Sequence, residues 1–129
     1  MEGRKNVNTD KIPRSNLAFP QAVAAGGFIF LSGTAGVDPE TGKLAENGFE
    51  GQARQAFTNV QTILHEAGSS MSKVVKITVL MVGGCDPDFS IINKIYTEFF
   101  PVDAPARSAP QLMPFPSGIL ISVDCIALQ

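Results

Sequence analysis

The first clear pattern along the chain is a pair of short apolar runs separated by two glycines. The runs are QAVAA at 21–25 and FIFLSG at 28–33, on either side of the glycine pair at 26–27. Glycine accepts the backbone angles of a tight hairpin turn, and β-branched and aromatic residues favour strands. The pattern therefore predicts a β-hairpin. The turn-forming residues DPETG at 38–42 then predict a chain reversal, followed by a loop to about Phe49.

Residues 49–67 repeat their apolar positions every three or four residues. That is the period of a helix with one face in a protein core. The apolar positions are Phe49, Ala53, Ala56, Phe57, Val60, Ile63, Leu64 and Ala67. Gly68 follows, where a helix often ends in a left-handed residue. The sequence therefore predicts an amphipathic helix over 49–67, and the β-branched run at 73–82 predicts a strand after it.

A second helical period runs over residues 89–99. Its apolar positions are Phe89, Ile92, Ile95, Tyr96 and Phe99. Asp86 and Pro87 precede the period, where an N-cap and a first-turn proline favour the start of a helix, and Pro101 ends it. The pattern therefore predicts a second helix between Asp86 and Pro101.

The remaining apolar segments predict two more strands. Residues 106–112 predict a short edge strand, because Pro110 lacks a backbone N–H and is tolerated only at an edge or a bulge. A loop at 113–118 leads to the last strand, at 119–128. The expected order is β-β-α-β-α-β-β, an α+β fold in which both helices can cover one face of a mixed sheet.

The strand at 73–82 is apolar on both of its alternating sides. Val75, Ile77, Val79 and Met81 form one side, and Val74, Leu80 and Val82 form the other. Two helices on one face leave the second face of the sheet to be buried by something else, and another copy of the chain is the simplest partner. We therefore expect a homo-oligomer.

Composition places these elements in one domain. The chain has 129 residues, 44% of them hydrophobic, which is enough for one core. The charged segment at 1–15 has no apolar run and predicts a flexible lead-in rather than a secretory signal, which leaves 16–129 as the folded domain. No apolar run approaches the roughly 20 residues of a membrane span. Two cysteines without a Cys-x-x-Cys spacing fit a reducing, cytoplasmic location.

Charge and residue inventory argue against several kinds of chemistry. Lys and Arg total 10 against 12 Asp and Glu, a formal charge of -2, which indicates no surface suited to nucleic acid. The single histidine, His65, and the two cysteines have no zinc-ligand spacing, so no metal is expected. The glycine-rich segment 32–36 lacks the lysine of a phosphate-binding loop. Lys73 and Lys76 are better explained as solvated lysines than as Schiff-base amines, because no burial is predicted around them.

Arg107 is the only charged residue in the segment 104–116. An arginine isolated among alanine, proline and phenylalanine commonly binds an anion. An ion pair with one of the protein's own carboxylates, or a surface guanidinium lying on apolar neighbours, explains the position equally well. Asp124 shares a side of the last strand with Ser122 and Ile126, away from the more apolar side, where an aspartate is most often solvated.

A set of segments carries a more specific signal. They are QAV at 21–23 with Gly26, FLSG at 30–33, DPETG at 38–42, QARQA at 52–56, NV at 59–60, NxxYxxFF at 93–100, PARS at 105–108 and the strand at 121–127. In this order and spacing they resemble the Rid (YjgF) family of reactive-intermediate imine deaminases, some of which carry the name endoribonuclease. The resemblance covers about residues 19–127. It implies a chorismate-mutase-like fold and a homotrimer whose sheets form a central barrel.

The resemblance also implies an activity and its residues. Family members hydrolyse 2-imino acids to 2-oxo acids and ammonia without a cofactor, at sites between subunits. Carried onto this chain, Arg107 binds the substrate carboxylate with two charge-assisted hydrogen bonds. Asp124 stands where the family commonly has a glutamate that orients water. Backbone groups near Ser32 and Gly33 are expected to contact the imine nitrogen.

Three further positions complete the expected substrate site. Phe19 stands where the family has tyrosine and Ala109 where cysteine is frequent, which predicts a more apolar pocket, while Asn93 matches the family but can also serve structure alone. These departures leave open a relative with a bulkier or more apolar substrate, or a regulator that binds small carboxylates without turnover. Endoribonuclease activity is the weaker interpretation, because the chain is acidic and offers no histidine base.

Overall fold

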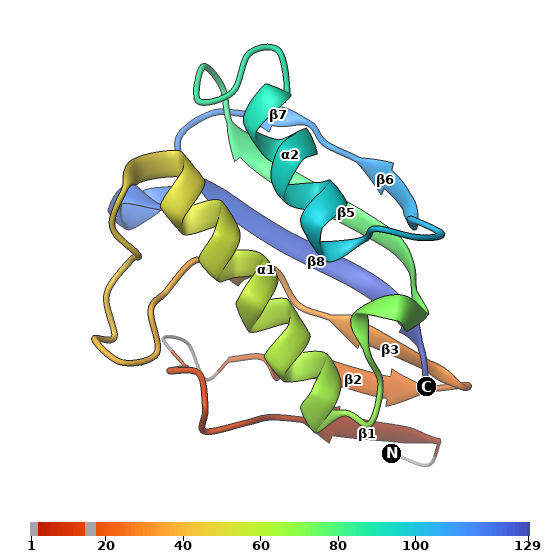
Figure 1. Cartoon of the computed structure of the whole chain (residues 1–129). Helices are drawn as coiled ribbons and strands as arrows, with labels where there is room; N and C mark the ends of the chain where they lie inside the picture. Colours follow the sequence, from red (N-terminus) through yellow and green to blue (C-terminus); the bar gives the residue numbers. More distant parts are fainter. Residues whose placement is uncertain (1–2, 15–17) are drawn as a thin grey trace.

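Both helices pack on the same face of one mixed sheet (Figure 1). The structure is a computed structural model and describes residues 3–14 and 18–129. Neighbouring strands follow the order β1-β2-β3-β8-β5-β6, with β4 paired to β8 and β7 paired to β5. The elements are β1 (Arg4–Val7), β2 (Ala22–Ala25), β3 (Phe28–Leu31), β4 (Thr34–Ala35), α1 (Gly48–Glu66), the short 3₁₀ helix η1 (Met71–Lys73), β5 (Val74–Val82), α2 (Ser90–Phe99), β6 (Ala106–Ser108), β7 (Gln111–Leu112), the 3₁₀ helix η2 (Pro116–Gly118) and β8 (Ile121–Leu128).

The predicted α+β order is confirmed, and the structure adds the short strands β1 and β4. The predicted hairpin is β2 and β3, joined by Gly26 and Gly27 at positive φ. The edge strand expected at 106–112 divides around Pro110 into β6 and β7, both parallel to β5. The carbonyl of Pro110 accepts a hydrogen bond from the N–H of Met81 at 3.1 Å, so the edge continues past the proline.

The flexible lead-in expected over residues 1–15 is replaced, in its described part, by ordered structure. β1 pairs antiparallel with β2 along its whole length. Beyond it, the side-chain amide of Gln21 accepts the N–H of Thr9 at 2.7 Å and donates to the carbonyls of Thr9 and Ile12 at 3.3 and 3.4 Å. Four residues with one apolar side chain are too few to show a period of two, so the pattern did not reveal this strand. Residues 1, 2 and 15 lie outside the described residues.

The core lies between the sheet and the two helices. Alternate residues of β8 point toward the helices and are buried, namely Ile121, Val123, Cys125 and Ala127. Phe57 of α1 is fully buried and packs against the rings of Tyr96 and Phe99 in α2. Burial, and to a smaller extent the neighbouring Asp124 carboxylate, raises the pKa of the Cys125 thiol to about 12. This thiol is therefore not a nucleophile at neutral pH.

The face of the sheet away from the helices carries exposed apolar side chains. A bulge between Val74 and Lys76 turns Val75 outward, so the prediction that Val75 shares a side with Ile77 is wrong. A bulge inserts one residue into the alternation, and residue types alone do not show it. The most exposed apolar residues on this face are Phe28, Phe30, Val75 and Leu128, at 39% to 45%. An apolar face of this kind favours contact with another protein surface.

The start of α2 differs from the prediction. Asp86 was expected as the N-cap, but the cap position is Phe89, in a left-handed conformation with φ of 61°. Asp86 still stabilises the N-terminus of the helix, because its carboxylate accepts hydrogen bonds from the N–H groups of Ile91 at 3.1 Å and Ile92 at 2.8 Å. It reaches them from the turn that precedes the helix. The predicted cap position is therefore wrong, whereas the carboxylate does bind the helix terminus.

Replacing Asp86 with alanine should destabilise this end of α2. Asp86 is 2% exposed, and its loss leaves two backbone N–H groups without their acceptor. We expect the free energy of unfolding to fall by about 1–3 kcal/mol. Thermal unfolding followed by circular dichroism measures the change. Asp88→Ala is the matched control, because Asp88 is exposed and accepts the N–H of Ser90 at the surface; an equal loss in both variants would contradict the role of Asp86.

Candidate functional site

A cavity of about 340 Å³ lies at the end of β3 and brings together three of the residues predicted for the site. Phe19, Ser32 and Gly33 all line it. The Ser32 hydroxyl donates to the carbonyl of Pro20 at 2.7 Å, which holds the segment that carries Phe19 against the end of the strand. These predicted residues therefore share one pocket.

Two glycines allow the chain to pass closely around this cavity. A Cβ on Gly33 would lie 2.7 Å from Oγ of Ser122, which also lines the cavity. A Cβ on Gly36 would lie 2.2 Å from the carbonyl oxygen of Gln52 in α1. Gln52 in turn donates from Nε2 to the carbonyl of Gly118 at 3.2 Å, in the loop that closes the other side. Gly36 thus allows close packing against the backbone of α1, where a Cβ would collide, whereas a Cβ at Gly33 would meet only the Ser122 hydroxyl.

Asp124 lies on β8 two residues beyond Ser122 and points to the same, helix-free face. It pairs with Thr78 of β5, and Lys76 lies diagonally from it on that face. Burial raises the pKa of the Asp124 carboxyl, and the ammonium group of Lys76 offsets part of that rise. The carboxylate is therefore a stronger base than an exposed aspartate, which suits a group that accepts a proton from water.

Lys76, which the sequence predicted to be a solvated lysine, makes an exposed hydrogen bond to the neighbouring strand. It is half-buried, and its Nζ donates to Oγ of Ser108 on β6 at 3.1 Å. Lys73, by contrast, is exposed, as predicted. Lys76 therefore connects β5 to the strand that carries Arg107. Sequence reasoning missed this contact because its two residues are 32 positions apart and meet only through the parallel pairing of β5 and β6.

Arg107 lies over an aromatic ring. Its guanidinium carbon is 4.8 Å from the centre of the Tyr96 ring on α2, and the Tyr96 hydroxyl donates to the carbonyl of Pro105 at 3.0 Å. Burial raises the pKa of the Tyr96 hydroxyl, and the positive charge of Arg107 offsets part of the rise. Among the described residues, no carboxylate forms an ion pair with Arg107. A guanidinium without an ion-pair partner is suited to bind an anion through its N–H groups.

Arg107 and Asp124 point to opposite faces of the sheet. Arg107 pairs with the buried Ile77 and contacts α2, so it lies on the helix side. Asp124 lies between the buried residues Val123 and Cys125 and therefore points away from the helices. Within one chain, the sheet therefore separates the two side chains.

The other predicted residues divide in the same way. Asn93 is exposed one turn before Tyr96 on α2, and Ala109 packs against the core beyond Arg107. We call Arg107, Asn93, Ala109 and Tyr96 the arginine group, and the cavity-lining Phe19, Ser32 and Gly33 the cavity group. Asp124 does not line the cavity and lies two residues beyond Ser122, which does. Of all these residues, Tyr96 is the residue whose role at the site the sequence did not indicate, because its contact with Arg107 depends on how α2 packs over β6.

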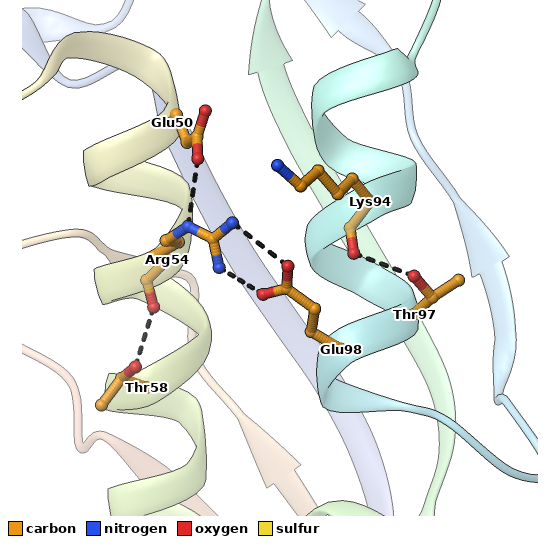
Figure 2. Close-up of polar contacts among 6 residues, drawn as sticks. All are labelled: Glu50, Arg54, Thr58, Lys94, Thr97 and Glu98. Carbon is orange, nitrogen blue, oxygen red and sulfur yellow. Dashed lines mark hydrogen bonds and ion pairs between the residues drawn. The ribbon is translucent and has the colours of Figure 1, made fainter.

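A surface ion-pair network fixes α2 relative to α1 (Figure 2). Arg54 of α1 binds Glu50 through Nε at 3.2 Å and binds both carboxylate oxygens of Glu98 on α2. The hydrogen bond to Glu98 is the main cause that raises the pKa of Arg54, and the same bond lowers the pKa of Glu98. The three side chains are 37% to 48% exposed, so the ion pairs are screened by solvent and contribute little to stability.

The part of the chain that the structure describes contains neither a metal-binding cluster nor a membrane-spanning helix. No three His, Cys, Asp or Glu side chains gather there in a way that could hold a metal ion. None of the helices there is long and apolar enough to cross a membrane.

Comparison with known proteins gives matches over nearly the whole chain. A family model described as endoribonuclease L-PSP matches residues 9–129. The chain is 38% identical to the Arabidopsis thaliana protein named Reactive Intermediate Deaminase A, chloroplastic, over 94% of this chain, and spans 64% of that protein's length. It is also 38% identical to the 2-iminobutanoate/2-iminopropanoate deaminase of Bos taurus, over 98% of this chain and 90% of that protein.

Solved structures show the same arrangement of helices and sheet. RidA from an Antarctic Psychrobacter species superposes with a TM-score of 0.89 at 34% identity, covering 97% of this chain and 99% of that one. TdcF of E. coli, solved with bound serine, superposes with a TM-score of 0.87 at 30% identity, covering 97% and 98%. The similarity therefore extends over the sheet, both helices and the loops around the cavity.

Proposed function

Because the chain belongs to the Rid (YjgF) family, whose matching model is described as endoribonuclease L-PSP, we propose that it hydrolyses 2-imino acids to 2-oxo acids and ammonia. The family membership and the YjgF-type α+β fold agree with the prediction from sequence. The observation that carries the proposal is Arg107, an arginine held on an aromatic ring with no carboxylate partner among the described residues.

Hydrolysis of an imine requires few catalytic groups from the protein. A protonated imine carbon is already electrophilic, so water adds to it, the C–N bond breaks, and the oxygen remains as the 2-oxo group. Both hydrogens of the water end on the nitrogen of the protonated imine, which leaves as ammonium, the protonated form of ammonia. The protein has to fix the substrate, polarise the imine and place the water. We propose that it does so with its own groups and without a cofactor.

Each group has a proposed role in this step. The Arg107 guanidinium holds the substrate carboxylate through two charge-assisted hydrogen bonds. Asp124 orients the water and accepts its proton, and its raised pKa supports that role. Backbone groups at Ser32 and Gly33 bind the imine nitrogen, and Phe19 forms an apolar wall of the cavity.

We propose that the site forms between copies of the chain, in a homotrimer. Arg107 and Asp124 lie on opposite faces of one sheet, and a neighbouring copy can bring one of each together. The exposed Phe28, Phe30 and Leu128 support an assembly through the helix-free face. The central barrel expected of such a trimer and the cytoplasmic location remain predictions, and one relative is named as chloroplastic.

Ammonia release tests the proposed function. An amino-acid oxidase or dehydratase that generates 2-iminobutanoate supplies the unstable substrate, and the purified chain should accelerate formation of ammonia and 2-oxobutanoate above the spontaneous rate. If the chain does not accelerate ammonia release from this or from longer imino acids, the proposal is contradicted. Binding of 2-oxobutanoate in the absence of turnover would favour the alternative of a carboxylate-binding regulator. We do not extend the endoribonuclease name to this chain, because its formal charge of -2 disfavours RNA binding.

A further inference from the structure

Arg14 places a positive charge at the cavity that the proposed function does not use. Of the described residues that line the cavity, Arg14 alone is charged. The other lining residues include the apolar Ile12, Pro13, Phe19 and Phe115. A guanidinium at the mouth of an apolar pocket is suited to an anionic group at one end of a mainly apolar ligand.

The Arg14 side chain is tethered but has donors to spare. Its Nη2 donates to the carbonyl of Phe19 at 3.3 Å, and the described chain records no ion pair for it. A guanidinium carries five N–H donors, so one hydrogen bond to the backbone leaves several for a ligand. The backbone before Arg14 is also held, because the carbonyl of Ile12 accepts a hydrogen bond from Gln21 at 3.4 Å. The charge is therefore kept near the cavity.

The cavity is larger than a four-carbon substrate requires. Its volume of about 340 Å³ lies in the range of pockets that bind whole small-molecule ligands, about 300–1,000 Å³. A four-carbon 2-imino acid has only about seven non-hydrogen atoms, far fewer than the drug-sized ligands that such pockets hold. A substrate that fills the cavity can thus extend several atoms beyond the imine.

We propose that Arg14 makes this chain selective for 2-imino acids with a second carboxylate at the end of a short apolar chain. The inference rests on the proposed function, because Arg107 is taken to hold the carboxylate next to the imine. Arg14 then binds the distal carboxylate across the cavity. The apolar lining packs on the methylene groups between the two charges.

Binding of stable product analogues tests this selectivity without turnover. 2-Oxoadipate and 2-oxohexanoate have the same six-carbon chain and differ in the terminal group, carboxylate against methyl. In calorimetric titration, the wild type should bind 2-oxoadipate at least about tenfold more tightly, the difference that one charge-assisted contact produces. Arg14→Gln should remove this preference without weakening 2-oxohexanoate binding, and Arg14→Lys should keep part of it. Arg4→Gln, which changes an exposed arginine on β1, should leave the preference intact.

The outcomes separate this inference from the proposed function. Equal affinities for the two acids in the wild type, or a preference that survives Arg14→Gln, would overturn the role of Arg14. If 2-oxohexanoate still binds and loses its binding in Arg107→Ala, the proposed carboxylate anchor stands while the selectivity fails. If the wild type binds neither acid, both proposals fail. Arg14 is exposed, so unchanged thermal unfolding of its variants is expected and excludes misfolding as the cause.

Discussion

Replacing Arg107 with alanine should lower kcat/KM for 2-iminobutanoate by about 10³-fold. Two charge-assisted hydrogen bonds to the substrate carboxylate are lost, each worth about 1.5–3 kcal/mol, and every 1.4 kcal/mol is roughly a factor of ten. Arg107→Lys keeps the charge but loses the planar pair of donors, so it should retain only part of the activity. The measurement is ammonia release at several substrate concentrations, which separates weakened binding from slowed turnover.

The loss of activity should not come from loss of structure. Arg107 is half-buried at the edge strand β6, and its contact with the Tyr96 ring contributes only about 0.5–1 kcal/mol at such a site. Thermal unfolding and oligomer mass of Arg107→Ala should therefore stay close to those of the wild type. Arg4→Ala removes an arginine from the exposed edge strand β1 and is the matched control for loss of charge. Activity of Arg107→Ala near the wild-type level would overturn the assignment of the anchor.

Long periodic segments of this fold were readable from the sequence because each carries its own pattern. The 19 residues of α1 repeat their apolar face over five turns, and the Gly-Gly pair marks the hairpin of β2 and β3. β1 has only four residues, of which one is apolar, and it is ordered by pairing with β2 rather than by its own composition. The bulge beside Val75 and the shifted start of α2 likewise depend on contacts between distant segments.

The candidate site was predictable by residue type but not by arrangement. Arg107 is conspicuous as a lone charge, yet the face it occupies follows from its parallel pairing with Ile77 across the α2 crossover. Lys76 resembles any solvated strand lysine until its bond to Ser108 is seen. Arg14 fell within the segment expected to be a flexible lead-in, and only the ordered contacts of Gln21 bring that segment to the cavity.

Replacing Asp124 with asparagine should lower kcat/KM by about 10²-fold, the usual contribution of a side chain that accepts a proton during the reaction. It should also remove a pH dependence. Burial raises the pKa of Asp124, so the wild type loses activity as the pH falls through this raised value and the carboxylate becomes protonated. Lys76 on β5 is the charged neighbour of Asp124. On the opposite side of β8, the neighbouring Ser32 and Gly33 are uncharged. Lys76→Met should therefore move the loss of activity to higher pH, whereas Asp124→Glu should retain activity.

Mixing the two inactive variants tests both the role of Asp124 and the place of the site. If each site takes Arg107 from one copy and Asp124 from its neighbour, trimers formed from equal amounts of Arg107→Ala and Asp124→Asn contain some interfaces with both groups intact. Random assembly makes about a quarter of the sites intact, and ammonia release should recover to about that fraction of the wild type. A site built within one chain would show no recovery, because every chain then lacks one of the two groups. Reassembly of either variant alone is the control, and it should remain inactive since no interface in it is complete.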